Sequence, residues 1–252
     1  MHDSVKKPKL SVIIVHYRTP ELLRLCLKRL DEHLKGIDYE VNVIDNSKNN
    51  IGFARGVNAG LRSTTGQYRL ILNPDTMITE GSVQKMLAYM DKHEDIGIMG
   101  PQLLYFNGEH QRSYHRLYRP MTILARRSFL GRIFKNVIDD FMMNDTDPNK
   151  IQTPDWILGA AMLVRGNALE RVGLMDEQYF LYFEDVDWCR RFWHNGYMVV
   201  YYPQAIFYHY YPRTSTSWNK TTLWHIASAM KFFKKWSRKN ISLPSSSSYV
   251  SP

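Results

Sequence analysis

The sequence predicts an α/β fold with a parallel sheet over about its first hundred residues. Apolar, β-branched runs alternate with helix-like segments there, and acidic residues follow the second and third runs. Continuous apolar runs are typical of strands buried on both faces, and strand–helix alternation is typical of right-handed βαβ units. We therefore expect a Rossmann-like half over residues 1–104, followed by a second half of different character.

The first strand is expected at Leu10–Tyr17, where the run LSVIIVHY has no polar alternation. A helix should follow from Thr19-Pro20, because Thr suits the N-cap and Pro the first helical position. Its apolar residues recur at helical spacing as one stripe. By the same criteria the next strands are expected at 41–45, 68–72 and 96–99, with helices over 53–63 and from 79 between them.

The second half, residues 105–217, continues the same domain with a different composition. Residues 156–165 read as a strand that carries the small residues GAA, which permit close approach of a ligand or of another backbone. Short helices are expected over 166–172 and from 184, and two short strands at 199–202 and 205–208. An amphipathic helix is expected within 218–241, and the serine-rich tail 242–252 should be disordered.

The overall composition limits the class of protein. The formal net charge of +9 over 252 residues favours an anionic partner, which a nucleotide, a nucleic acid or an acidic membrane surface would satisfy. Cys26 and Cys189 are far apart in sequence and are expected as free thiols in a reducing compartment. No apolar stretch is long enough to span a bilayer, and the N-terminus lacks an apolar signal region, so a cytoplasmic location is expected.

Two aspartates follow neighbouring strands, Asp45 after the second and Asp75 after the third. Ligands of open α/β sheets bind beyond the carboxyl ends of the strands. Asp75 could hold a divalent cation on a phosphate, and Asp45 could accept a hydrogen bond from a base or a ribose. Each alone is most simply a turn former. The pair favours a nucleotide-diphosphate site, whereas the missing GxGxxG fingerprint argues against NAD or FAD.

A third acidic group, Glu184 and Asp185, directly follows the aromatic run YFLYF. At a helix start the macrodipole favours anions, and capping alone needs only one of them. Apolar surroundings raise the pKa of a carboxyl group, which suits a general base. Asp187 is at i,i+3 and i,i+4 spacing from Arg190 and Arg191, so an ion pair within the helix is its simplest role.

Basic residues concentrate in two places and leave two interpretations open. Between 105 and 150 they form either a solvated face or a surface towards phosphate or anionic lipid. The C-terminal helix has an apolar face and a lysine-rich end, which favours a membrane-surface segment over a helix docked on the core. The basic residues of the middle segment are Arg112, His115, Arg116, Arg119, Arg126, Arg127, Arg132 and Lys135. The apolar face of the C-terminal helix consists of Leu223, Ile226, Ala227, Met230, Phe233 and Trp236. Its basic end consists of Lys231, Lys234, Lys235, Arg238 and Lys239.

Five motifs in order resemble the family 2 glycosyltransferases, inverting enzymes of the GT-A fold. They are SVIIVHYRTPELL, VIDNSKNNIGFARGVNAGL, LNPDT, WILGAAMLVR and YFLYFEDVDWCRR. The second and the last two are similar to signatures of the bacterial rhamnosyltransferase-like branch, and LNPDT stands where the family has its DxD-type motif. The resemblance extends from Leu10 to about His209. It implies an α/β GT-A fold, in which a Rossmann-like nucleotide-binding half and an acceptor-side half share a mixed central sheet.

The resemblance also implies roles on the donor side. Asp45 would contact the base of a UDP- or dTDP-sugar, and Tyr17 would lie against that base. Arg55 and Asn58 would sit near the nucleotide or the sugar. Asp75 would hold Mg²⁺ or Mn²⁺ on the diphosphate, with His209 completing the metal site.

One position departs from the family pattern, because Asn73 stands where the first acid of DxD is expected. The site is therefore less negative, although an Asn carbonyl still coordinates a hard cation. On the acceptor side the resemblance implies that Asp185 is the catalytic base, with Glu184 beside it. The QxxRW motif and the membrane helices of processive members are absent, so one sugar or a few per acceptor are expected.

The expected function is therefore transfer of a sugar, rhamnose from dTDP-rhamnose first, to a lipid-linked or polysaccharide acceptor in bacterial surface glycan synthesis. The enzyme would work at the inner face of the plasma membrane as a peripheral protein. A UDP-hexose donor and an inactive nucleotide-sugar-binding protein are the alternatives. Nucleic acid is not an expected partner, because the acids of the proposed site would repel its phosphates.

Overall fold

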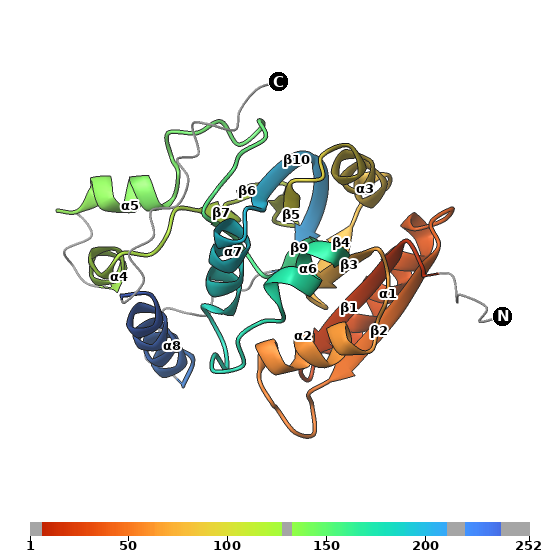
Figure 1. Cartoon of the computed structure of the whole chain (residues 1–252), viewed down its shortest axis with the longest axis horizontal. Helices are drawn as coiled ribbons and strands as arrows, with labels where there is room; N and C mark the ends of the chain where they lie inside the picture. Colours follow the sequence, from red (N-terminus) through yellow and green to blue (C-terminus); the bar gives the residue numbers. More distant parts are fainter. Residues whose placement is uncertain (1–6, 128–132, 211–219, 238–252) are drawn as a thin grey trace.

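The computed structural model describes residues 7–127, 133–210 and 220–237, and Figure 1 shows an α/β domain around one large sheet. The predicted tail 242–252 and the end of the predicted C-terminal helix lie outside these residues. The strands are β1 (Leu10–His16), β2 (Tyr39–Asp45), β3 (Tyr68–Leu72), β4 (Thr76–Ile78), β5 (Ile96–Leu104), β6 (His110–Gln111), β7 (Tyr114–His115), β8 (Trp156–Ile157), β9 (Ala161–Arg165) and β10 (Met198–His209). The helices are α1 (Pro20–His33), α2 (Phe53–Arg62), α3 (Ser82–Lys92), α4 (Pro120–Arg127), α5 (Lys135–Phe141), α6 (Gly166–Val172), α7 (Glu184–His194) and α8 (Lys220–Ser237).

The central sheet is mixed, as the family resemblance implied, and has the order β2-β1-β3-β9-β5-β10-β4. The strands β2, β1 and β3 are parallel, while β9 is inserted antiparallel between β3 and β5. Strand β4 pairs antiparallel with β10 at the far edge, and β6 extends β5 as a short hairpin. The parallel direction predicted from strand–helix alternation therefore holds for β2, β1, β3 and also β5, since β3 and β5 are both antiparallel to β9, and β10 pairs parallel with β5.

Strand β1 divides the core into two parts because successive side chains point to opposite faces. Leu10, Val12 and Ile14 pack in a cluster with apolar residues of α1 and α3. Ile13 and Val15 face the other cluster, to which α2, α6 and α7 contribute. The outlying helices α4, α5 and α8 gather at one end of the molecule, away from α1 (Figure 1).

Several predicted boundaries differ from the structure. The strand predicted over 156–165 is two strands, β8 and β9, separated by a turn at 158–160. The two strands predicted at 199–202 and 205–208 are one strand, β10, with a register shift between Tyr202 and Ile206. Strand β4 was not predicted, because three residues are too few for a period. Both cysteines are buried free thiols, as expected.

The C-terminal helix α8 docks on the core. Its buried residues are Ser228, Ala229, Phe232 and Trp236, whereas Leu223 and Met230 are 63% and 69% exposed. Of the predicted apolar stripe, only Trp236 is buried. No helix in the described part of the chain is long and apolar enough to cross a lipid bilayer.

Candidate active site

The carboxyl ends of three adjacent strands bring the predicted donor-side residues to one edge of the sheet. His16, at the end of β1, lies opposite Asp45 on β2, and Ile14 lies opposite Leu72, the last residue of β3. Strand β9 begins at the same edge, because Ala161 pairs with Leu72. The segment 73–75 and the turn 158–160 therefore meet beside the end of β1.

Asp45 is a solvent-exposed residue of this edge. Its side chain is 56% exposed, and its Oδ1 lies 3.1 Å from Nε2 of His16. The backbone N–H of Ser47 donates to Oδ1 over 2.7 Å. Hydrogen bonds from Ser47 lower the pKa of Asp45 below its ordinary value, so the carboxyl group is an anion at neutral pH. A solvated, charged acceptor at this position can receive an N–H from a ligand.

Tyr17 lies next to Asp45 in the fold, because it follows His16 directly. Its ring is 44% exposed, and the guanidinium of Arg18 lies over it, 5.2 Å from the ring centroid. The backbone N–H of Arg18 donates to the hydroxyl of Ser47. Arg18 has a φ of 56°, an uncommon conformation for a residue with a side chain. The edge therefore offers an aromatic face and a cation beside the Asp45 anion.

Asp75 and His209 face each other across β4 and β10, with 3.4 Å between Oδ1 and Nε2. The buried Oδ1 of Asp75 accepts no hydrogen bond from the described residues. Nδ1 of His209 lies 2.9 Å from Oε1 of Gln111. An amide oxygen accepts only, so Nδ1 carries the proton, and the lone pair of a neutral ring then points from Nε2 towards Asp75. A proton on Nε2 would be donated to Oδ1 of Asp75, and a divalent cation would accept an electron pair from each of the two atoms.

A divalent cation fits this pair, because metal-bound histidines commonly donate their other N–H to a neighbouring oxygen. No cluster of three or more His, Cys, Asp or Glu side chains suited to a metal occurs among the described residues. A cation held by Asp75 and His209 would take its remaining ligands from diphosphate oxygens and water. Asn73 lies two residues before Asp75, and its backbone N–H donates to the carbonyl of Ala160 over 2.9 Å.

Glu184 and Asp185 are the buried end of the site, 5% and 8% exposed. Asp185 accepts one backbone hydrogen bond on each oxygen, from Gly159 at 2.9 Å and from Val186 at 2.8 Å. The Oε2 atom of Glu184 is buried and accepts none from the described residues. Burial raises the pKa of both groups, and the charge of Asp185 raises that of Glu184 further. The backbone donors favour an anion at Asp185, so of the two groups Glu184 keeps its proton to the higher pH.

One turn joins this acidic pair to the donor side. Gly159 donates to Asp185, and the next residue, Ala160, accepts from Asn73. Two adjacent residues of one turn, Gly159 and Ala160, therefore connect Asp185 to the Asn73–Asp75 segment. The structure therefore brings the acids predicted for the donor and the acceptor side to the same edge of the sheet.

The residues before Glu184 form a strained turn. Tyr182 and Phe183 both have a φ of 69°, and such non-glycine residues concentrate at functional sites. Helix α8 supports the turn, since the ring centroids of His225 and Phe183 are 5.2 Å apart and those of Phe232 and Phe183 are 5.4 Å apart. The site is thus held from behind by aromatic packing.

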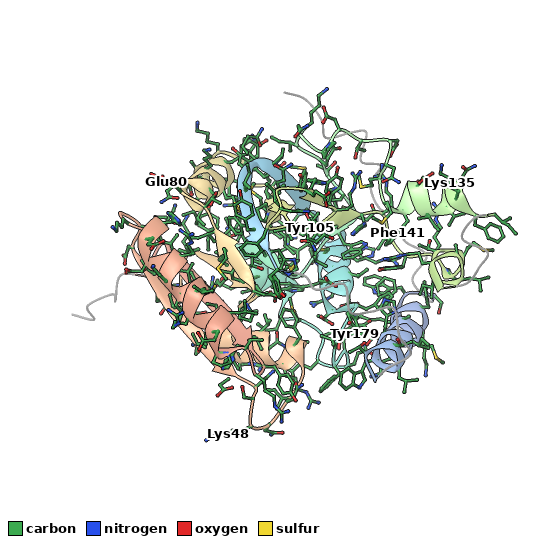
Figure 2. All side chains as sticks on the ribbon, turned by 180° about the vertical axis from the view of Figure 1, so that it is seen from behind. Lys48, Glu80, Tyr105, Lys135, Phe141 and Tyr179 are labelled. Carbon is green, nitrogen blue, oxygen red and sulfur yellow. The ribbon has the colours of Figure 1, made fainter. Side chains whose placement is uncertain are left out.

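A buried ion network fastens α8 to this region. Asp187 has no exposed surface and accepts hydrogen bonds from Arg191, Lys235 and Trp236. Lys235 also bonds Asp176, at the start of the loop that leads to the turn. Figure 2 shows Tyr179 of the same loop where α8 meets the core. The ion-pair role predicted for Asp187 is confirmed with Arg191 as the partner, and the pair is largely buried.

Gly52 shows what one residue of the motif VIDNSKNNIGFARGVNAGL does in the fold. It has a φ of 92°, and a Cβ atom here would lie 2.7 Å from the carbonyl oxygen of Phe180. That carbonyl accepts the N–H of Phe53, the first residue of α2. A side chain at position 52 would push the loop before Glu184 away from α2.

Arg55 and Asn58 point to that same loop and not to the strand ends. Asn58 is 1% exposed, its Nδ2 donates to the carbonyl of Met175, and its Oδ1 accepts the N–H of Met175. Arg55 lies 3.8 Å from Glu177. Because both polar ends of Asn58 are used, its geometry favours holding the loop. The predicted contacts of these two residues with a nucleotide stay predictions.

Some side chains of the basic middle segment make contacts within the fold, and others are exposed. Arg112 donates to Tyr114 and to the carbonyl of Met143, and Arg126 donates to Tyr118. His115 is buried against aromatic rings, and burial lowers its pKa to about 3. Arg119 is exposed. The predicted roles of Arg132 and of the Arg127 side chain concern parts of the chain outside the described residues.

The sequence analysis did not identify three residues that contact the predicted site residues. Gln111 faces His209 from 98 positions away, and no local pattern signals such a pair. Gly159 belongs to a small-residue run whose purpose was left open, and its N–H is the partner of Asp185. His16 ends the first strand, so its place beside Asp45 could have been found by aligning the two strand ends.

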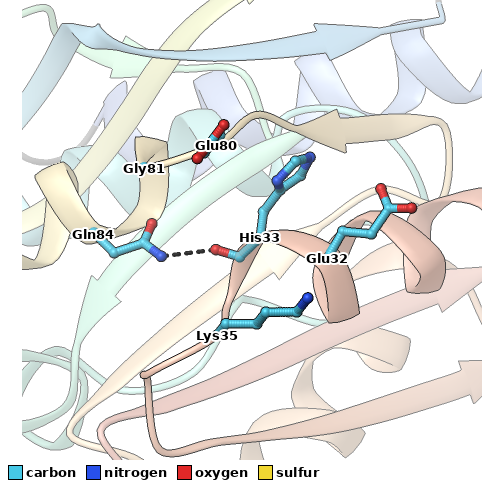
Figure 3. A pocket seen from close by; sticks show the side chains of 6 residues that line it. All are labelled: Glu32, His33, Lys35, Glu80, Gly81 and Gln84. Atoms are coloured by element: carbon cyan, nitrogen blue, oxygen red, sulfur yellow. Dashed lines mark hydrogen bonds between the residues drawn. The ribbon is translucent and has the colours of Figure 1, made fainter.

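A separate surface hollow lies at the other end of α1 (Figure 3). It is lined by Glu32, His33, Lys35, Glu80, Gly81 and Gln84, and Gln84 donates to the carbonyl of His33 over 2.7 Å. Helix α1 has 14 residues and begins near Tyr17, so the hollow at its other end is roughly 20 Å from the Tyr17 end of the candidate site. Its mixed charges offer a diphosphate no focused positive field.

Comparisons with known proteins match glycosyltransferases. The family model described as "Glycosyl transferase family 2" matches residues 27–152. Rhamnosyltransferase WbbL of Escherichia coli is 29% identical over 217 residues, covering 84% of this chain and 78% of that protein. N-acetylglucosaminyl-diphospho-decaprenol L-rhamnosyltransferase of Mycobacterium tuberculosis is 29% identical over 146 residues, covering 56% of this chain and 46% of that protein. The chain therefore matches less than half the length of the mycobacterial relative.

Solved structures share the GT-A fold at low identity. The structure of GalNAc-T7 with UDP, GalNAc and Mn²⁺ has a TM-score of 0.61 at 13% identity, and the match covers 92% of this chain and 48% of that one. Mannosyltransferase PcManGT of Pyrobaculum calidifontis, in complex with GDP-Man and Mn²⁺, has a TM-score of 0.59 at 15% identity, with 95% and 67% covered. At these identities the likeness concerns the fold.

Proposed function

The chain belongs to glycosyl transferase family 2, and from this premise we propose that it is an inverting enzyme that transfers a sugar from a nucleotide donor to a hydroxyl group. The proposed acceptor is lipid-linked or a polysaccharide, and the proposed process is bacterial surface glycan synthesis. The observation that carries the proposal is the meeting of donor-side and buried acids at one sheet edge. Asp45 and the Asp75–His209 pair lie on the donor side, and Asp185 is joined to them through the turn 158–160.

Rhamnose from a dTDP donor is the first choice, because two relatives similar over much of this chain are named as rhamnosyltransferases. Asp45 suits such a donor, since thymine presents an N–H to a carboxylate. Uracil presents the same group, so a UDP-hexose is the alternative donor. Tyr17 would stack on the base, with Arg18 covering the other face of the ring.

Mg²⁺ or Mn²⁺ would be held by Asp75 and His209 on the diphosphate, and two solved relatives of the fold are complexes with Mn²⁺. Once bound, the cation offsets the charge that develops on the leaving diphosphate. Asp75 supplies an oxygen that has no hydrogen bond within the described chain. Gln111 fixes the ring of His209 so that Nε2 faces that oxygen.

Asp185 would act as the base. As the acceptor oxygen attacks the anomeric carbon, its O–H bond breaks and the proton passes to the carboxylate of Asp185. The bond from the anomeric carbon to the diphosphate oxygen breaks on the opposite face, and the configuration inverts. The raised pKa of Asp185 brings it closer to that of a useful base at neutral pH. Glu184, which keeps its proton, would limit the negative charge beside Asp185.

The test is transfer by the purified chain, with dTDP-rhamnose or UDP-hexoses and with Mg²⁺, Mn²⁺ or a chelator. We expect release of the nucleoside diphosphate that depends on acceptor and cation, and a product of inverted configuration by NMR. Nucleotide-sugar binding without any transfer would favour the alternative, an inactive binding protein, which Asn73 in place of the usual acid suggests. Retained configuration would contradict the role of Asp185 as a base.

We also propose that the enzyme works as a peripheral protein at the inner face of the plasma membrane, because a lipid-linked acceptor resides there. The acids at the site disfavour nucleic acid as a partner. The division at residue 104 stays part of the proposal, with the nucleotide on one side and the acceptor on the other.

A further inference from the structure

Helix α8 has two faces with different surroundings. The inner face is buried against α7 and the turn before it, through Phe232 and Trp236. The outer face carries Leu223, Ala227, Met230 and Lys234, which follow each other at helical spacing and are all exposed. Leu223 is 63% and Met230 is 69% exposed. Large apolar side chains this open on a docked helix leave an apolar stripe without a partner in the described chain.

Helix α4 adds a second set beside it. Met121 and Leu124, one turn apart, are 42% and 49% exposed. The rings of Tyr118, just before α4, and His225 on α8 have centroids 6.3 Å apart, and both helices form the same end of the molecule (Figure 1). We name the exposed residues Met121, Leu124, Leu223 and Met230, with the exposed cations Arg119 and Lys234, the α4–α8 patch.

Charge is distributed unevenly along the sequence, and the segments that carry this patch are basic, with Asp139 and Asp140 of α5 directly after the first of them. Segments 110–138 and 188–252, which contain α4 and α8, hold sixteen lysines and arginines and no aspartate or glutamate. The rest of the chain holds seventeen of the 33 basic residues and all 24 acidic ones, so it is net negative. The exposed apolar side chains therefore lie in the part of the sequence with only positive charge.

We propose that the α4–α8 patch docks the enzyme on the surface of an anionic lipid bilayer. Apolar side chains with cations on the same helix are the pattern of a surface that enters the headgroup region of such a membrane. A second copy of the chain fits less well, because a symmetric contact would bring the positive patches together. The inference deepens the proposed function and rests on it in one respect, the lipid-linked acceptor.

The docked helix lies directly behind the acidic pair. Ser228 of α8 donates to the carbonyl of Leu181, and Lys231 donates to that of Gln178. The ring of Trp224 lies 4.9 Å from that of Phe180. A membrane under the outer face of α8 would thus be one helix away from the loop that ends in Glu184. An acceptor carried on a lipid would have a short path to Asp185.

The test is sedimentation of the full-length protein with vesicles of phosphatidylcholine alone, or of phosphatidylcholine with about one third phosphatidylglycerol. The apolar variant is Leu223→Ser with Met230→Ser, and the charge variant is Arg119→Gln with Lys234→Gln. Leu25→Ser is the control, because Leu25 is 42% exposed on α1, in the other half of the molecule. None of the patch residues belongs to the proposed catalytic or donor-binding set.

We expect about tenfold stronger partitioning onto the anionic vesicles, lost in both double variants and unchanged in Leu25→Ser. Absence of vesicle binding, or equal binding by the apolar variant, would overturn the proposal. A dimer that dissociates on Leu223→Ser with Met230→Ser would overturn it as well and assign the patch to a second copy. Donor turnover is measured separately, so vesicle binding without turnover contradicts only the proposed function, and turnover without vesicle binding contradicts only the patch.

Discussion

The candidate site holds carboxyl groups in two different environments, exposed on the proposed donor side and buried on the proposed base side. Asp45 is exposed, and hydrogen bonds from Ser47 lower its pKa. Glu184 and Asp185 are buried, and burial raises the pKa of both. A carboxyl group that stays charged suits binding and orientation, whereas one near its titration range suits proton transfer. Exposure, more than residue type, therefore separates the two roles, and each prediction below changes one side alone.

The largest effect is expected on the base side, from Asp185→Asn. Removing the base should lower kcat by about 10²- to 10⁴-fold, because that is the usual contribution of general-base catalysis. Donor affinity by calorimetry should stay unchanged, since Asp45 and Asp75 are intact. Glu184→Gln is the matched comparison and should keep far more activity. Near-normal turnover in Asp185→Asn would show that another group takes the proton.

Next in size is Asp75→Ala at the cation pair. We expect a loss of roughly ten- to a hundredfold in cation-dependent donor affinity, with His209→Ala similar and Gln111→Ala smaller. The measurement is calorimetry with dTDP or UDP in the presence of Mn²⁺ or of a chelator. Glu80→Gln, in the separate hollow of Figure 3, is the control and should change nothing. Equal affinities with and without Mn²⁺ in the wild-type protein would remove the cation from the site.

A smaller effect is expected from Asp45→Asn on the exposed side. The variant loses one hydrogen bond to a charged acceptor that is open to solvent, so donor affinity should fall about tenfold. The kcat at saturating donor should hardly change. Asp38→Asn, exposed near the opposite end of the same strand, controls for surface charge. A drop in kcat with unchanged affinity would reverse the roles given to the two sides.

The smallest effect concerns stability, through Glu184→Gln. Burial raises the pKa of folded Glu184 above its ordinary value of 4.5. The folded chain therefore holds a proton that the unfolded chain has lost, and the free energy of unfolding falls as the pH rises above 4.5. Glutamine removes this dependence. We expect Tm to rise by roughly 2–4 °C at pH 8, as about 1 kcal/mol would produce, and to stay unchanged at pH 4. A gain of the same size at both pH values would exclude titration as its cause.

The sequence predicted the ends of β2 and β3 well because the signals for these strands are local. A buried strand has a continuous apolar run, and the residue after it is then known, as with Asp45 and Asp75. Strand direction has no such signal. The antiparallel insertion of β9 between β3 and β5 depends on contacts between distant segments, so only the family resemblance indicated a mixed sheet.

The faces of α8 were harder to predict because its apolar residues lie almost all around the helix. The stripe chosen from spacing contains Leu223 and Met230, which are exposed, and omits Phe232, which is buried. Asn58 shows the same limit at a single residue. Its motif suggested a ligand contact, yet its amide meets the backbone of Met175, 117 positions further on. Such partners are set by the tertiary fold.

The most direct test of the central claim is a crystal structure of Asp185→Asn with a dTDP-sugar and Mn²⁺, with the metal located from its anomalous signal. The account predicts a Mn²⁺ peak between Asp75 and His209, the base against Asp45, and residue 185 facing the anomeric carbon from the side opposite the diphosphate. A nucleotide bound elsewhere, for example in the hollow of Figure 3, or an anomeric carbon turned away from residue 185, would contradict it.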